Sequence, residues 1–188
     1  MFSLDHTDRT IISLLAENPE SSQSEIAQKL RMSQPSIGAR IRKLKKHGFI
    51  AHQVGVSITK TKTGIAKIDV YAKDSAKILE NMKEKCPLFL NGFITSGRHN
   101  LCLFLVFEDI SSVNACIDHD LRENPLVSDV EVSIVVSSAR EVIVPMNLRP
   151  RKNKTSSCGR QCNKCNRYNS EQCYGCPNTI YYKGILFK

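Results

Sequence analysis

The sequence predicts an α+β protein of 188 residues in three consecutive parts, and three patterns carry that prediction. Residues 1–62 contain apolar residues at helical spacing between capping residues. Residues 63–147 alternate strand and helix patterns, and residues 148–188 contain five closely spaced cysteines. We therefore expect a helical domain, a mixed αβ domain and a small cysteine-rich tail.

Charge differs between these three parts. Residues 1–62 hold 10 Lys and Arg against 5 Asp and Glu, residues 63–147 hold 8 against 12, and residues 148–188 hold 9 against 1. The two basic ends suit a polyanion such as nucleic acid, whereas the acidic middle part does not. Because the sequence has neither an 18-residue apolar run nor a secretory signal pattern, we expect a cytoplasmic protein that does not bind membranes.

Two consecutive helices are predicted within residues 22–48. Ser22 and Glu25 have the spacing of a capping box, which begins the first helix. Ser33 is a suitable N-cap for the second helix, which ends at Gly48. A further helix is expected before them, and three helices suffice to bury the inner faces of a helix-turn-helix.

The second of these helices has a basic outer face. Ile37, Ile41 and Leu44 lie on one stripe and should pack inward. On the other side, small residues near the helix start allow approach to base edges, and the basic residues that follow neutralise phosphates or pair with guanine. An ordinary solvated helix of a small bundle is the alternative. We expect contacts with double-stranded DNA from Ser33, Gln34, Ser36, Arg40, Arg42 and Lys43.

The segment SQSEIAQKLRMSQPSIGARIRKLKKHGFI, with LDHTDRTIISLLAEN before it, resembles the N-terminal domain of the Lrp/AsnC family of prokaryotic transcription regulators. Residues 49–58 are rich in β-favouring side chains and would form the short wing of a winged helix-turn-helix or a connecting strand. The resemblance implies that Ser33, which opens the recognition helix, and Arg40, in the R-I-x-x-L run, lie at the DNA.

Residues 64–144 show strand and helix patterns in the order β-α-β-β-α-β. This is the ferredoxin-like order, in which four antiparallel strands carry both helices on one face. The pattern contains no catalytic constellation, so we do not expect an enzyme. His99 and His119 have no evident partner and are expected to be solvated. The isolated cysteines are expected to be small buried hydrophobic side chains: Cys86, Cys102 and Cys116.

The same order resembles the effector-binding and dimerisation domain of the Lrp/AsnC family. The resemblance implies pairing through the sheets into dimers and often octamers, with an amino-acid effector bound between dimers. The family's G-x-x-D ligand turn is matched here by Gly97, Arg98, His99 and Asn100. Because asparagine replaces the acidic residue, an ammonium group would lose an ionic partner. The turn is therefore either a small-molecule effector site or only a hairpin.

The tail cysteines have the spacing C-x3-C-x2-C-x7-C-x2-C. Two C-x2-C pairs can bring four thiolates onto one tetrahedral ion, and a metal would supply folding energy to a segment with so small a core. Free surface thiols are the competing interpretation. We expect zinc, with an iron–sulfur cluster as the alternative, bound by four of Cys158, Cys162, Cys165, Cys173 and Cys176.

Together these patterns predict a sequence-specific DNA-binding transcription regulator that acts as a dimer or higher oligomer and responds to metal, redox state or a small ligand. The alternative is a metal or redox sensor, or a ligand-binding assembly module, whose DNA binding is secondary. An enzyme using the cysteines is disfavoured, because neither a substrate-pocket motif nor a cofactor-binding glycine loop accompanies them.

Overall fold

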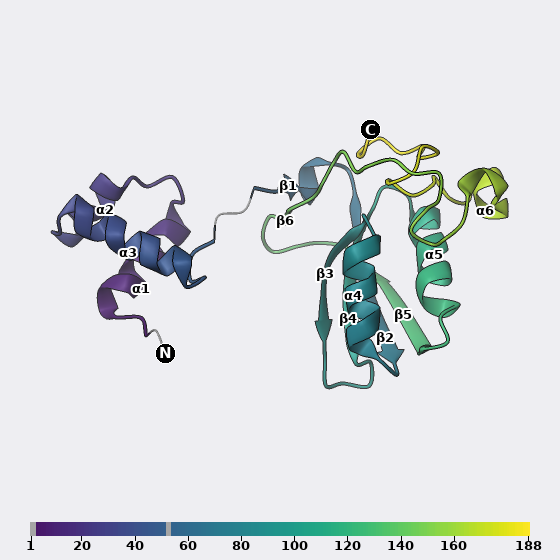
Figure 1. Cartoon of the computed structure of the whole chain (residues 1–188), viewed down its shortest axis with the longest axis horizontal. Helices are drawn as coiled ribbons and strands as arrows, with labels where there is room; N and C mark the ends of the chain where they lie inside the picture. The colour runs from purple at the N-terminus through teal and green to yellow at the C-terminus, as the bar shows by residue number, and fades with distance from the viewer. Residues whose placement is uncertain (1–2, 52–53) are drawn as a thin grey trace. The chain divides into compact units, whose positions relative to one another are not determined.

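The computed structural model describes residues 3–51 and 54–188, and the chain forms two compact units, residues 1–53 and 54–188. Figure 1 follows the chain from the N-terminal helices through a sheet to the C-terminal tail. The described ranges contain no helix that is long and apolar enough to cross a membrane. The α+β class predicted from the sequence is confirmed.

The N-terminal unit contains three helices: α1 (His6–Glu17), α2 (Gln23–Leu30) and α3 (Gln34–Lys46). Apolar side chains from all three form one core, and its buried members are Ile11, Ile26, Ala27, Ile37, Ile41 and Leu44. The apolar residues that recur at helical spacing in the sequence are thus the residues through which the three helices pack together.

Polar contacts begin α2 and α3 where the sequence predicts. The Ser22 hydroxyl accepts the amide of Glu25, and the Glu25 carboxylate accepts the amide of Ser22 at 2.7 Å, so the capping box is complete. Ser33 Oγ accepts the amide of Ser36 at the start of α3. Arg31 closes α2 in the left-handed conformation, with φ of 52°, and allows the tight turn into α3.

The second unit is built on a four-stranded antiparallel sheet with the order β3-β4-β2-β5. The strands are β2 (Gly64–Ala72), β3 (Phe89–Ile94), β4 (Leu101–Phe107) and β5 (Val127–Ile134). Two helices, α4 (Ser75–Lys85) and α5 (Ile110–Ile117), cover one face of the sheet (Figure 1). This is the predicted ferredoxin-like arrangement.

Alternation along the central strands separates the two faces of this sheet. Ile68 and Val70 of β2, with Leu103 and Leu105 of β4, are fully buried against the helices. Tyr71 lies on the opposite side and is 48% exposed. The main core therefore lies between the sheet and the helices. On the other face, a second cluster covers Ile65 and Val106 at one end, whereas Tyr71 and Phe93 remain exposed.

A second, two-stranded sheet pairs β1 (Val56–Ser57) with β6 (Ile143–Val144). The strand expected after α3, as a wing or a connecting strand, thus pairs inside the second unit and serves as the connecting strand. Residues 54–62, which the sequence placed with the first domain, belong to this unit. Residues 52 and 53 of the expected segment lie outside the described residues.

The tail forms only short helical turns, η3 (Cys162–Lys164) and α6 (Asn166–Asn169), and packs against the αβ domain (Figure 1). Phe187, 1% exposed, packs with Val106 of β4 in a cluster beneath the β1–β6 pair. The small core expected of an isolated tail is therefore extended by apolar residues of the αβ domain.

Candidate functional site

The outer face of α3 carries most of the predicted DNA contacts. Gln34, Ser36, Arg42 and Lys43 are exposed there. The hydroxyls of Ser33 and Ser36 lie 2.8 Å apart at the helix start. Small polar residues at the first turn, followed by arginine and lysine, give a helix that can enter the major groove.

Arg40 differs from the other predicted DNA contacts because its guanidinium is held by α1. Its Nη1 atom lies 2.6 Å from Asp5 Oδ2 and 2.7 Å from Asp8 Oδ1. The backbone amide of Asp8, followed by the Arg40 guanidinium, lowers the pKa of the Asp5 carboxyl. Arg40 therefore ties α3 to α1, a role that its position in the sequence did not indicate. Its contact with DNA remains a prediction.

Arg40→Ala is expected to destabilise the N-terminal unit by about 1–3 kcal/mol, because the buried Asp8 carboxylate loses a charged hydrogen-bond partner. Hydrogen exchange of the α1 and α3 amides measures the change, with Arg42→Ala on the exposed side of α3 as control. Equal protection in both variants would contradict the structural role.

The effect of Arg40→Ala should also depend on pH. The pKa of Asp5 is lowered in the folded protein. The ionised Asp5 carboxylate therefore contributes to stability above its ordinary pKa of 3.8, and this contribution is lost as the pH falls through the lower pKa of the folded state. The difference between wild type and Arg40→Ala in the same exchange measurement should therefore shrink below about pH 4.

The predicted effector turn lies between β3 and β4, and three of its residues have partners, among them Arg98, whose Nη2 lies 3.7 Å from Asp129 Oδ2. Asn100 Nδ2 donates to the carbonyl of Ala72 at 2.7 Å, while its Oδ1 accepts the amide of Ala72 at 2.9 Å. His99 Nε2 lies 3.1 Å from Asp129 Oδ2, so the expectation of a solvated His99 is wrong. Asn100 ties the turn to the end of β2.

Two residues of this turn, Gly97 and Arg98, are exposed. Arg98, Tyr71 and Asp129 line an open hollow of about 300 Å³. The predicted effector residues are thus next to a recess that contains one guanidinium and one carboxylate.

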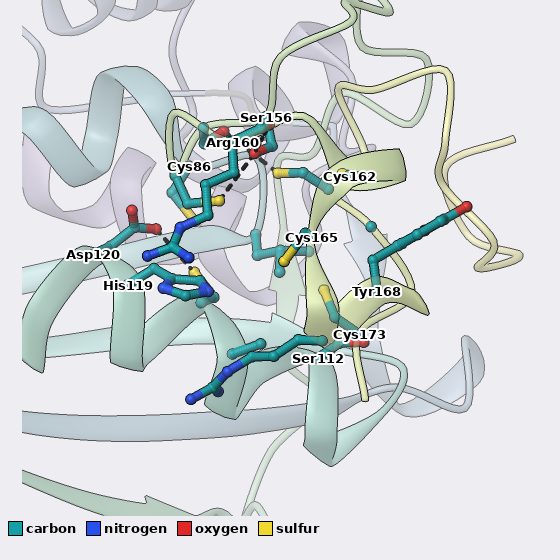
Figure 2. Close-up of a pocket in the computed structure, with 18 residues that line it drawn as sticks. Cys86, Ser112, His119, Asp120, Ser156, Arg160, Cys162, Cys165, Tyr168 and Cys173 are labelled. Carbon is teal, nitrogen blue, oxygen red and sulfur yellow. Dashed lines mark hydrogen bonds between the residues drawn. The ribbon is translucent and has the colours of Figure 1, made fainter. Parts of the chain in front are cut away.

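Seven of the eight cysteines line one cavity between the tail and the helices of the αβ domain, which we call the cysteine cavity (Figure 2). The cavity measures about 60 Å³. Two of these cysteines belong to the αβ domain: Cys86, which caps the end of α4, and Cys116 of α5. The other five are the predicted ligands Cys158, Cys162, Cys165, Cys173 and Cys176.

Cys86 is buried in the core of the αβ domain and Cys116 packs against that core, as expected, but the two cysteines are not isolated, because both also line the cysteine cavity. A hydrogen bond with Cys86, together with burial, raises the pKa of the Cys116 thiol. Cys102 is the cysteine that does not line the cavity; it is buried on β4, where burial raises its pKa.

The cysteine side chains surround the cavity without forming a finished coordination site. Among residues 3–51 and 54–188, no three His, Cys, Asp or Glu side chains are placed so that they could hold a metal ion. Ser156 Oγ lies 2.9 Å from Cys158 Sγ, and Ser157 Oγ lies 3.4 Å from Cys176 Sγ. Burial raises the pKa of the Cys176 thiol to about 12. Metal binding would need side-chain movement toward the ion.

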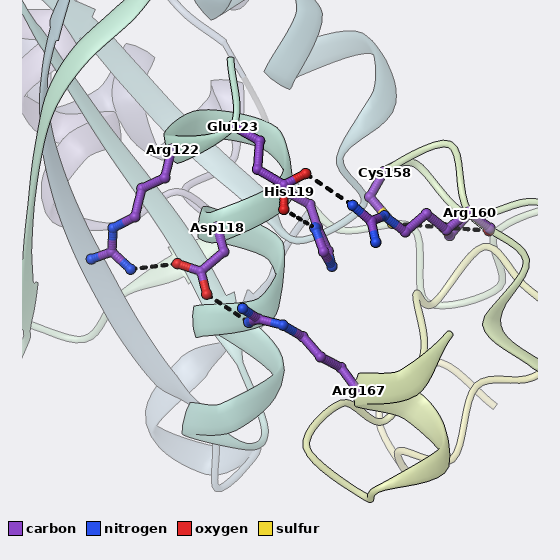
Figure 3. Close-up of polar contacts among 8 residues, drawn as sticks. Asp118, His119, Arg122, Glu123, Cys158, Arg160 and Arg167 are labelled. Carbon is purple, nitrogen blue, oxygen red and sulfur yellow. Dashed lines mark hydrogen bonds and ion pairs between the residues drawn. The ribbon is translucent and has the colours of Figure 1, made fainter. Parts of the chain in front are cut away.

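Ion pairs hold the tail against the end of α5 and the π-helical segment that continues it, η2 (Asp118–Arg122) (Figure 3). Arg160 Nη2 lies 2.9 Å from Glu123 Oε2, and Arg167 Nη1 lies 2.6 Å from Asp118 Oδ2. Two arginines of the basic tail thus pair with acidic residues of the αβ domain. Part of the positive charge that suggested binding of a polyanion is therefore neutralised within the chain.

His119 is also at this junction and, like His99, is not solvated as expected. Its side chain is 8% exposed and lines the cysteine cavity (Figure 2). Nδ1 lies 3.0 Å from Glu123 Oε1, whereas Nε2 is buried and has no hydrogen-bond partner among the described residues. The spacing of four residues between His119 and Glu123 was the available signal in the sequence.

Comparison with known proteins identifies the class. A family model described as winged helix-turn-helix DNA-binding matches residues 4–51. The chain is 27% identical over 155 residues to the transcriptional regulator AzlB of Bacillus subtilis (strain 168), a match covering 77% of this chain and 96% of that protein. With the three-helix unit and the basic face of α3, these matches define a DNA-binding transcriptional regulator.

Solved structures identify the fold more closely. AsnC of E. coli is similar at a TM-score of 0.65 and 20% identity, covering 74% of this chain and 96% of that one. The regulator NMB0573 of Neisseria meningitidis, in a complex with L-Met, is similar at 0.64 and 22%, covering 73% and 93%. The chain is thus similar in fold to the Lrp/AsnC-family regulators, and the relative that it matches is described as a transcriptional regulator rather than an enzyme.

Proposed function

We propose that this regulator binds DNA as a dimer or larger assembly and that a metal held in the cysteine cavity controls its DNA affinity. Zinc is the first candidate and an iron–sulfur cluster is the alternative. The observation that carries the proposal is the gathering of seven cysteines, from the tail and from the αβ domain, around one cavity.

The chemistry of the cavity wall favours a metal. Structural zinc takes four cysteine or histidine ligands, and soft thiolates also suit iron–sulfur clusters. A four-thiolate zinc site carries two net negative charges, and the guanidinium groups of Arg160 and Arg167, each already paired with a carboxylate, lie on the wall of the same cavity. A bound cation would also favour the thiolate form of the buried thiols.

A metal in this position would hold the tail on the helices that support the sheet. The tail already contacts α5 through a hydrogen bond of 2.8 Å from the Tyr174 amide to Ser112 Oγ. In the proposed mechanism, the metal stabilises this packing, the sheet forms the dimer interface, and the dimer presents two α3 helices to successive half-sites.

Elemental analysis and a visible spectrum of the full chain, purified without oxygen, test the metal proposal. We expect about one zinc per chain and no visible colour. A brown chromophore with iron and sulfide would select the alternative cofactor. Protein that contains no metal, and takes up none when zinc or iron and sulfide are supplied to the reduced chain, would contradict the proposal.

The face of the sheet opposite α4 and α5, which we call the open sheet face, is the proposed dimer interface. Phe93 is 51% exposed, and its ring packs against Phe104 at a centroid distance of 6.3 Å. Tyr71, 48% exposed, lies on the same face. Exposed aromatic side chains of this kind are enriched at protein interfaces.

Phe93→Lys is expected to raise the dimer dissociation constant about 30-fold or more, because a charge would be buried in the interface at a cost of about 2 kcal/mol or more. Light scattering across a dilution series measures this change. Ile110→Lys is the control, since Ile110 is 50% exposed at the start of α5, away from the open sheet face. Equal dissociation constants for the two variants would place the interface elsewhere.

A small-molecule effector at the turn formed by Gly97, Arg98, His99 and Asn100 is the second candidate input. The hollow beside this turn contains the guanidinium of Arg98 and the carboxylate of Asp129, which complement the carboxylate and ammonium groups of an amino acid. The structural neighbour NMB0573 was crystallised with L-Met. Calorimetric titration with free amino acids tests this input, and no heat of binding with any of them would exclude it.

A further inference from the structure

The buried imidazole of His119 stands at the wall of the cysteine cavity with one nitrogen unpaired. Its side chain is 8% exposed, and Nε2 has no hydrogen-bond partner among the described residues. A buried polar atom without a hydrogen-bond partner is unfavourable and rare in native proteins, so the unpaired Nε2 atom needs an explanation. Cys86 and Cys165 line the same cavity beside it (Figure 2).

The other nitrogen of the ring fixes the tautomer. Nδ1 lies 3.0 Å from Glu123 Oε1, and an ionised carboxylate can only accept a hydrogen bond. In a neutral imidazole the proton is therefore assigned to Nδ1, and Nε2 has a lone pair. A carboxylate that orients one histidine nitrogen while the other binds a metal is the usual second-shell arrangement of metal-binding histidines.

We propose that Nε2 of His119 is a ligand of the metal in the cysteine cavity, alongside thiolates of the tail. This inference rests on the proposed metal function of that cavity. Three cysteines and one histidine form a common structural zinc set. The metal is then shared between the tail and the αβ domain, and it links the two directly.

Glu123 connects this ligand to the docking of the tail. Oε1 of Glu123 lies 3.0 Å from His119 Nδ1, and Oε2 lies 2.9 Å from Arg160 Nη2 of the tail (Figure 3). One carboxylate thus orients the histidine and holds the arginine. His119 itself lies in the π-helical segment η2. The π-helical conformation is rare in proteins overall, and where it occurs it is often found at functional sites. Binding of metal and docking of the tail should therefore strengthen each other.

X-ray absorption at the edge of the bound metal, measured on the full chain purified without oxygen, tests the ligand directly. We expect one nitrogen and three sulfur ligands around zinc. In a chelator competition, His119→Ala should bind zinc at least tenfold more weakly than wild type. His99→Ala should bind zinc as wild type does, because His99 pairs with Asp129 and does not line the cavity.

The outcomes separate this inference from the function on which it rests. An all-sulfur spectrum, with unchanged zinc affinity in His119→Ala, would overturn the histidine ligand and leave the metal function in place. A wild-type chain that binds neither zinc nor an iron–sulfur cluster would overturn both. If His119→Ala fails to fold, the X-ray absorption spectrum of the wild-type protein still shows whether a nitrogen ligand is present. If the protein contains an iron–sulfur cluster, the same measurement is made at the iron edge.

Discussion

Replacing Arg42 and Lys43 together by alanine is expected to weaken binding to a selected DNA duplex about 10- to 100-fold at low salt. Both residues are exposed on the outer face of α3, where the sequence places the contacts to phosphate. Each cation that neutralises a phosphate releases a counterion, so the slope of log affinity against log salt should fall by about 2. Fluorescence anisotropy at four or five salt concentrations measures both quantities.

Lys77→Ala with Lys83→Ala is the matched control for this pair. It removes the same charge from α4 of the αβ domain, and both lysines are exposed. Its affinity and salt slope should stay close to those of wild type. If the two double variants lose affinity equally and keep equal slopes, net charge rather than the α3 surface accounts for binding.

Cys162→Ser with Cys176→Ser is expected to abolish stoichiometric metal binding and to loosen the tail. The two side chains come from the two C-x2-C pairs and line one cavity, so the variant removes one thiol from each pair. Loss of a structural metal removes folding energy from the segment that it holds. Amide protection in residues 156–187 should fall by tenfold or more in hydrogen exchange, while α1 and α3 keep theirs.

Cys102→Ser tests whether this effect belongs to the cysteine cavity. Cys102 is a buried cysteine of the same chain that does not line the cavity. The single variant should keep its metal and the protection of its tail. If the double variant retains a full complement of metal, the ligands lie elsewhere and the proposed site is wrong.

The elements of the fold could be predicted because their signals are local. Ser22 and Ser33 cap helices with contacts that span only three residues of sequence. In β2, the alternation of Ile68 and Val70 with polar neighbours determines which side faces the helices. Residues that act through their immediate neighbours can be interpreted from sequence without knowledge of the tertiary structure.

The composition of the sites depends on contacts between distant segments, and the sequence indicated only part of it. Arg40 meets Asp8 across 32 residues of sequence, so its ion pair was not foreseen. The spacing of the tail cysteines predicted a metal-binding group, but Cys86 and His119 join it only because the tail packs on α4 and α5. The sequence pattern of a helix shows which side of the helix is apolar, but it does not show which other segment of the chain will cover that side.

The central claim is that metal in the cysteine cavity controls DNA affinity, and one titration tests it most directly. A labelled duplex, selected from a random library by the metal-loaded protein, is titrated with the full chain before and after removal of its metal by a chelator. We predict that the stripped protein binds at least fivefold more weakly, within the usual range of coupling between sites, and that restoring the metal restores affinity. Equal affinity of the loaded and stripped proteins would contradict the claim.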